Sequence, residues 1–229
     1  MLRKEWISGV QMHSEDWFTK RLSKFTSSEW HLVMGERGIG EGGKSYIYRK
    51  VGELLTGIVN KKEIATEATE HGNLYELENL RMFAKVMGLD FLVTQKLIAP
   101  QDSKHSSTPD ALIVNYEAEN KEEYSVSTVE AKCPLTYDNY IKLWKCKTPF
   151  DVKKVKPEFY WQTLHQMWVC DSLVGYLSVY HPHFRVGQLR IIEFKKIDLV
   201  SEFKLLKQRA IEAELLFDET VKEMMDERI

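Results

Sequence analysis

The chain has 229 residues, of which 43% are hydrophobic and 29% charged, and its formal net charge is −2. This composition is typical of a globular protein with a substantial core, and the near-neutral charge does not mark a general nucleic-acid binder. We find no apolar run of roughly 20 residues, as a membrane helix needs, and no apolar secretory segment, so we expect no membrane partner. Three cysteines, Cys133, Cys146 and Cys170, are expected to be reduced thiols in a cytoplasm.

Hydrophobic spacing predicts helices and strands in a definite order. Apolar residues recur at helical spacing over 27–34, 46–58 and 65–87, and Thr26 to Glu29 match a capping box before the first helix. β-Rich runs at 91–100, 109–117 and 124–135 predict three consecutive antiparallel strands. A helix over 157–173 follows, then strands at 173–182 and 188–197. An amphipathic helix over 198–227 is expected to pack on the sheet, with an oligomer contact as the alternative. The order predicts one α/β domain over residues 1–229.

The glycine-rich stretch 38–45, GIGEGGKS, fits the phosphate-loop pattern G-x-x-x-x-G-K-[ST]. That pattern binds a nucleotide when it follows a strand, because the turn then aims its N–H groups at the phosphates. Here the preceding segment repeats at helical spacing. We therefore expect a link between two helices and no nucleotide cofactor.

Two acids and a lysine lie on strands that follow one another in the chain. Asp110 opens the run 109–117, and Glu130 and Lys132 stand two residues apart, so they point to the same face of the next strand. If the strands pair, the two carboxylates come together, and a cation between them allows both to stay ionised. Oxygen ligands suit Mg²⁺ or Mn²⁺, and Lys132 could orient or deprotonate a water that attacks a phosphodiester. The alternative is a surface aspartate beside a strand ion pair.

Five short motifs, in order, resemble the phage lambda-type exonuclease or YqaJ-like viral recombinase family of the PD-(D/E)xK nuclease superfamily. The motifs are Trp17-x-x-x-Arg21-Leu22-x-x-Phe25-Thr26-Ser27-Ser28, Gly72-x-x-x-Glu76, Thr108-Pro109-Asp110, Glu130-Ala131-Lys132-Cys133-Pro134 and Gln162 with Met167-Trp168-Val169. Four positions depart from the family pattern: Ser23 and Ala111 replace glycines, Phe159 replaces a tyrosine, and Thr108 replaces a serine and keeps its hydroxyl.

The resemblance implies a restriction-endonuclease-like α/β core with a central mixed five-stranded sheet flanked by helices. It also implies an Mg²⁺-dependent enzyme that digests one strand of linear duplex DNA from its 5′ end. The resulting 3′ single-stranded tails would pass to a single-strand annealing recombinase. Such enzymes are often ring-shaped homotrimers, and a phage-encoded member works in the host cytoplasm.

The resemblance also assigns roles to single residues. Metal ligands would be Asp110, Glu130, the Ala131 carbonyl and, for a second ion, Glu76. Lys132 would position the water with support from Gln162. Arg21, Ser28 and Thr108 would hold the terminal 5′-phosphate, for which a guanidinium fork and hydroxyls are suitable groups.

Three questions stay open at the level of sequence. One alternative is a structure-specific endonuclease of the same superfamily, and another is a non-catalytic module that binds DNA ends. The segment 142–156 carries six lysines against one acid and is flanked by aromatic residues, so it suits a phosphate backbone, but it could equally be a solvated loop.

Overall fold

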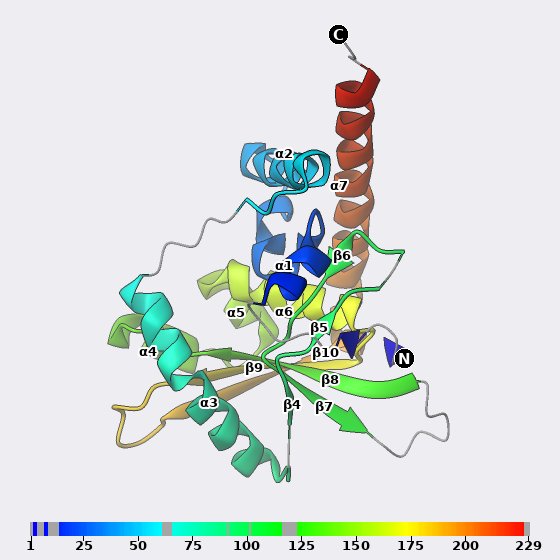
Figure 1. Ribbon diagram of the computed structural model, residues 1–229. Coiled ribbons are helices and arrows are strands. Elements are labelled where there is room, and N and C mark those ends of the chain that lie inside the picture. The colour runs from blue at the N-terminus through cyan, green and yellow to red at the C-terminus, as the bar shows by residue number, and fades with distance from the viewer. Residues whose placement is uncertain are drawn as a thin grey trace.

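Figure 1 presents a computed structural model of the chain. It describes residues 2–3, 7–8, 14–60, 66–90, 92–100, 102–115 and 123–226. Positions 65, 91, 116–117 and 227 of the predicted elements lie outside these residues.

The centre of the fold is a mixed sheet in the order β10-β9-β8-β7-β4. Its long strand β8 (Glu123–Lys132) pairs antiparallel with β7 (Ala111–Asn115) and parallel with β9 (Val174–Tyr180). The strand β10 (Leu189–Lys195) and the two-residue β4 (Val93–Thr94) form the edges, and β1 (Leu2–Arg3) pairs with the start of β8. The predicted mixed five-stranded sheet is therefore confirmed.

Helices cover both faces of this sheet (Figure 1). A parallel pair needs a crossover, and three helices supply it between β8 and β9: α4 (Tyr137–Trp144), α5 (Pro149–Val155) and α6 (Pro157–Val169). On one face, α6 packs its buried Leu164 and Met167 into the largest core cluster. On the other, α3 (Glu67–Met87) packs Leu80 and Phe83 against Val129. The acids predicted from sequence lie between these two layers.

Two short strand pairs lie beside the main sheet. The strand β3 (Phe25–Thr26) runs parallel to β6 (His105–Ser106), and β2 (Ile7–Ser8) pairs antiparallel with β5 (Leu97–Ile98). The β3–β6 pair joins the N-terminal region, which includes α1 (Glu15–Arg21), to the segment that leads into β7. It brings Thr26 opposite Ser106.

The structure corrects several predicted elements. The run 91–100 is two short strands rather than one, because Gln95 has a φ of 53°, which breaks an extended chain. The helix over 27–34 is a 3-10 helix, η2 (Ser27–Val33), and the capping box is wrong: Thr26 makes no capping bond with its side chain, and Glu29 pairs with Arg49. The sequence analysis also did not predict α1, α4 and α5.

The stretch GIGEGGKS joins η2 to α2 (Glu41–Thr56), as the predicted link between two helices requires. The helix begins five residues earlier than predicted, so Gly42 to Ser45 lie in its first turns. A Cβ on Gly43 would come within 2.8 Å of the Leu32 carbonyl oxygen, so this glycine allows α2 to approach η2 closely. Lys44 forms an ion pair with Glu41 at 2.8 Å.

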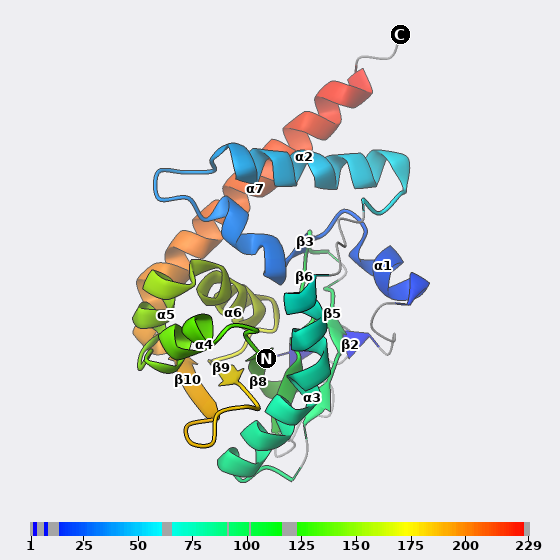
Figure 2. The same ribbon diagram turned by 90° about the vertical axis from the view of Figure 1, so that its left-hand side faces the viewer.

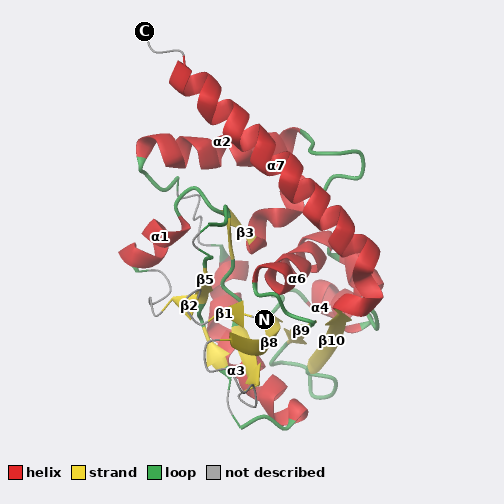
Figure 3. Ribbon diagram, turned by 90° about the vertical axis from the view of Figure 1, so that its right-hand side faces the viewer, coloured by secondary structure: helices red, strands yellow, loops and turns green. Residues whose placement is uncertain are grey.

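The last helix, α7 (Val200–Asp226), follows a short 3-10 turn, η3 (Lys196–Leu199). It crosses α2, and its far end projects beyond the body of the molecule (Figures 2 and 3). The prediction of an amphipathic helix is confirmed, with Phe203, Leu206 and Phe217 buried. It packs mainly on α2, η3 and α6 rather than on the sheet, so the predicted packing partner is wrong.

Candidate functional site

The start of β7 places Asp110 beside β8. The register pairs Ala111 with Val129, so Pro109 would be the residue opposite Ala131. The side chain of the next residue reaches Ala131 as well: the Asp110 carboxylate accepts the N–H of Ala131 at 2.7 Å. The predicted meeting of Asp110 with the second strand is therefore present, and it is fixed by a main-chain hydrogen bond.

Glu130 lies under α6 and is only 2% exposed. Its Oε1 accepts from Lys132 Nζ at 2.5 Å and from Gln162 Nε2 at 2.5 Å. Its Oε2 accepts from Gln166 Nε2. A buried carboxylate is costly unless donors surround it, and these three groups supply them. Lys132 and Gln162, for which the sequence suggested a role at the attacking water, thus both donate to Glu130.

The electrostatics of the cluster follow from burial and repulsion. Burial, followed by repulsion from Glu130, raises the pKa of Asp110 well above its usual range, while Lys132 opposes the shift. Burial lowers the pKa of Lys132, but attraction to Glu130 and Asp110 outweighs it, so that the net pKa is raised. A site that disfavours two ionised carboxylates favours a cation beside them.

Asp110 and Lys132 line a cavity of about 490 Å³ between α3, the end of β8 and α6. Glu76 of α3 lines it together with Asp110 and Lys132, and it adds to the repulsion that raises the pKa of Asp110. Lys156 and Phe159 line the opposite wall, and the Lys132 ammonium lies 5.0 Å from the Phe159 ring centroid. Two of the predicted acids, Asp110 and Glu76, therefore share one cavity with the predicted lysine, while Glu130 is buried next to it.

The donor set fits a hard divalent cation. Asp110, Glu130 and Glu76 offer only oxygen, as Mg²⁺ and Mn²⁺ prefer. Within the described part of the chain, no three His, Cys, Asp or Glu side chains are already arranged around a single point. The reason at Glu130 is that Lys132 and the two glutamines use its oxygens, so binding would require the carboxylate to exchange one of these donors for the ion.

The predicted phosphate residues also meet. Arg21, Ser28 and Thr108 line a second cavity of about 140 Å³, which Gln162 and Gln166 line as well. The hydroxyls of Thr108 and Ser106 are buried there and have no hydrogen-bond partner among the described residues. Unsatisfied buried hydroxyls are costly, and an anion that accepts from them would remove that cost.

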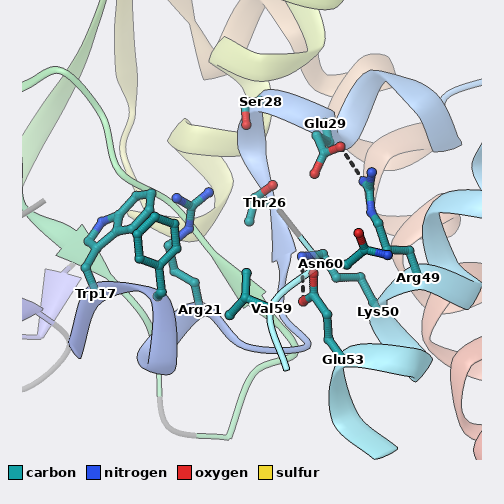
Figure 4. Close-up of a pocket in the computed structure, with 11 residues that line it drawn as sticks. Trp17, Arg21, Thr26, Ser28, Glu29, Arg49, Lys50, Glu53, Val59 and Asn60 are labelled. Carbon is teal, nitrogen blue, oxygen red and sulfur yellow. Dashed lines mark hydrogen bonds and ion pairs between the residues drawn. The ribbon is translucent and has the colours of Figure 1, made fainter. Parts of the chain in front are cut away.

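A third, outer cavity of about 270 Å³ adjoins the second through Trp17, Arg21, Thr26 and Ser28 (Figure 4). Arg21 lies over the Trp17 ring, 3.8 Å from its centroid, because the two residues are one helical turn apart on α1. On the other side, the cavity is bounded by two ion pairs, Arg49 with Glu29 and Lys50 with Glu53.

The sequence analysis missed two residues of the site. Gln166 stands one helical turn after Gln162, and that i, i+4 spacing could have placed it on the same face of α6. Ser106 stands two residues before Thr108, on the same side of an extended segment. Neither residue belongs to a motif that had been singled out.

The fold matches solved nucleases. An alkaline exonuclease from Laribacter hongkongensis, LHK-Exo, superposes with a TM-score of 0.67 at 20% identity, over 93% of this chain and 99% of that one. Its complex with dAMP gives 0.66 over the same shares. A phage-related exonuclease from Haemophilus somnus 129PT gives 0.62 at 15% identity, over 88% and 96%. The class of fold is therefore that of these exonucleases.

Residues 16–172 match the family described as the YqaJ-like viral recombinase domain. This match covers more than half of the chain, and the chain belongs to that family. A search of curated proteins gave no significant match. In the part of the chain that the structure describes, no helix is long and apolar enough to cross a membrane.

Proposed function

We propose that the protein is a metal-dependent exonuclease that digests one strand of linear duplex DNA from its 5′ end. The observation that carries the proposal is the position of Gln162 and Gln166. Both donate to Glu130, and both line the cavity that holds Arg21 and Thr108. A terminal phosphate in that cavity would therefore lie next to the acids, and the following phosphodiester would reach them.

The chemistry would be shared among a few side chains. A divalent cation, Mg²⁺ or Mn²⁺, held by Asp110, Glu130 and the Ala131 carbonyl, with Glu76 toward a second ion, would supply charge stabilisation at the scissile phosphate. Lys132 stays protonated beside Glu130, so it orients the attacking water and offsets negative charge that develops on the phosphate. Gln162 keeps the Glu130 carboxylate in place.

The 5′-end preference would come from the second cavity. Arg21 is held over Trp17, which fixes the direction of its guanidinium, and Ser28 and Thr108 add hydroxyls. One relative of this fold, LHK-Exo, has been solved with dAMP, a nucleoside 5′-monophosphate. A mononucleotide of this kind is the product that the proposed reaction would release.

The basic segment 142–156 supports a DNA substrate. It forms the end of α4, all of α5 and the turn into α6, and Lys156 lines the cavity of the acids. Trp144 and Phe150 are exposed beside it. Exposed aromatic rings among lysines suit a nucleic-acid backbone and its bases.

By the family resemblance, we also propose a homotrimer that encircles duplex DNA and passes 3′ tails to an annealing recombinase. Light scattering on the purified protein should then give three times the 26.8 kDa of one chain. A monomer at working concentration would contradict this part alone.

Two labelled substrates test the polarity. With Mg²⁺ or Mn²⁺, linear duplex labelled on its 5′-phosphate should release labelled mononucleotide at once, and duplex labelled at the 3′ end should release label last. EDTA, Glu130→Ala and Lys132→Ala should each abolish release in protein that stays folded.

A covalently closed circle separates the alternatives. An exonuclease leaves it intact, whereas a structure-specific endonuclease would nick branched or circular forms. A non-catalytic end-binding module would bind the labelled duplex and release nothing under any metal. Release from the 3′ end first would exclude the proposed polarity.

A further inference from the structure

A chain of buried hydrogen bonds runs from α7 to the phosphate cavity. Ser27 Oγ lies 2.8 Å from His165 Nδ1, and His165 Nε2 lies 2.9 Å from His105 Nδ1. His105 Nε2 in turn lies 3.0 Å from Glu214 Oε1. Ser27 lines the phosphate cavity beside Ser28, while the Glu214 side chain is 37% exposed at the surface. The exonuclease chemistry proposed above uses none of these four groups.

The surroundings of the two histidines make the chain costly to break. His165 and His105 are fully buried among the rings of Phe25, Trp30 and Trp168. None of those rings offers an acceptor for an imidazole N–H, since an indole can only donate. In such surroundings, a polar group that loses its partner keeps the whole cost of its desolvation.

This hydrogen-bond chain joins three of the elements that form the phosphate cavity. η2 supplies Ser27 to the chain and Ser28 to the cavity. Likewise, β6 supplies His105 to the chain and Ser106 to the cavity, and α6 supplies His165 next to Gln166. Ser27 Oγ also lies 3.0 Å from Ser107 Oγ, a hydrogen bond that ties η2 to the segment carrying Thr108.

We propose that His165, His105 and Glu214 are positioning residues that set the specificity of the phosphate cavity for 5′-phosphorylated ends. Glu214 fixes one end of the chain from α7, the chain fixes Ser27, and Ser27 fixes the spacing of Ser28 from Ser106 and Thr108. The inference rests on the proposed function for its substrate, and it adds residues that touch neither DNA nor metal.

Glu214 allows a clean test, because it forms the surface end of the hydrogen-bond chain and its side chain is 37% exposed. Glu214→Leu removes the partner of His105 Nε2. Glu214→Gln keeps one, since an amide can both donate and accept. Glu219→Leu is the matched control, because Glu219 is an exposed carboxylate on the same helix and takes no part in the hydrogen-bond chain.

The readout is the digestion of duplexes that differ only in a 5′-phosphate or a 5′-hydroxyl. Glu214→Leu should raise KM for phosphorylated ends about tenfold, the effect of one lost charged hydrogen bond. Its kcat, and its rate on hydroxyl ends, should stay at the wild-type value. Glu214→Gln and Glu219→Leu should match wild type in all three. An unchanged phosphate preference in Glu214→Leu, or an equal loss in Glu214→Gln, would overturn the proposal.

A second measurement separates this inference from the proposed function. Ring-nitrogen NMR signals of His165, assigned by their loss in His165→Gln, should move in metal-free, DNA-free Glu214→Leu and stay in place in Glu219→Leu. Unchanged His165 signals in Glu214→Leu would overturn the proposal, even if the variant is an active enzyme. Wild-type protein could instead digest 5′-phosphate and 5′-hydroxyl ends equally while the signals move. The assignment of the cavity as a phosphate site would then be wrong, and so would the specificity role. The hydrogen-bond chain would have only a structural role.

Discussion

At the scale of single residues, the site depends on how one buried carboxylate is held. Glu130 receives hydrogen bonds from a lysine of its own strand and from two glutamines of α6. The alternation of strand side chains was enough to predict the lysine. The glutamines could be placed only by the packing of α6 on β8, which local spacing does not specify. For this reason Gln162 was assigned to the site only through the family resemblance, and Gln166 was not predicted.

Gln166 gives the first prediction. Gln166→Leu keeps the side-chain volume and removes the donor to Glu130 Oε2, so the carboxylate should lose its fixed orientation. We expect the digestion rate on linear duplex to fall about ten- to a hundredfold, the effect of a lost charged hydrogen bond. The measurement is kcat at saturating Mg²⁺, with the exposed Gln208→Leu on α7 as control. A rate equal to that of the control would show that Gln162 and Lys132 suffice to hold Glu130.

At the scale of elements, the pairing of β7 with β8 and the position of α6 followed from hydrophobic pattern and from Pro157. The local structure of the region before the sheet could not be predicted in this way, because it depends on contacts between residues that are distant in sequence. The N–H of Thr26 donates to the Tyr46 hydroxyl at 2.7 Å, and Glu29 pairs with Arg49. These contacts from α2 replace the capping box that the local sequence indicates, and the result is a 3-10 helix.

The glycines of the phosphate-loop look-alike give the second prediction. Gly43→Ala should destabilise the protein by about 1–3 kcal/mol, because its Cβ would overlap the backbone of Leu32 and Val33. Gly42→Ala, one residue away, meets nothing within 4 Å and should be neutral or stabilise by up to about 1 kcal/mol. Urea unfolding measures both. Equal stability of the two variants would mean that α2 does not pack closely on η2.

At the scale of the whole molecule, two polar networks cross the core. One joins Asp110, Glu130 and Lys132, and the other joins Glu214 to Ser27 through two histidines. That the chain is one domain and a trimer stays a prediction. Sequence patterns located the first network, because its members stand in short motifs. The second was not foreseen, because His105, His165 and Glu214 are each isolated in the sequence.

The histidines give the third prediction, on acid stability. Burial, then the neighbouring His105, holds the pKa of His165 well below its usual range, and burial lowers that of His105 although Glu214 opposes it. The unfolded chain therefore takes up protons below about pH 6.5 while the folded chain does not, so stability falls as the pH falls, by at most about 1.4 kcal/mol per pH unit for each histidine.

Asp110 acts with the opposite sign, because its raised pKa means that the folded chain takes up that proton first. Comparison with His165→Gln isolates the histidine contribution. Urea unfolding in EDTA between pH 7.5 and 5.5 should show a steeper acid loss for wild type than for this variant. Parallel curves would mean that His165 already carries a proton in the folded state.

In the proposed function, Asp110, Glu130 and Glu76 hold a divalent cation that is needed to cut DNA. Asp110→Asn tests it most directly, because asparagine can still accept the Ala131 N–H and no longer repels Glu130. In EDTA the variant should be at least as stable as wild type, and Mg²⁺ should no longer stabilise it. Its digestion of 5′-phosphorylated linear duplex should fall by about a thousandfold or more, as expected for several kcal/mol of lost charge stabilisation. A folded Asp110→Asn variant that digests DNA at the wild-type rate would show that cleavage needs no cation at Asp110.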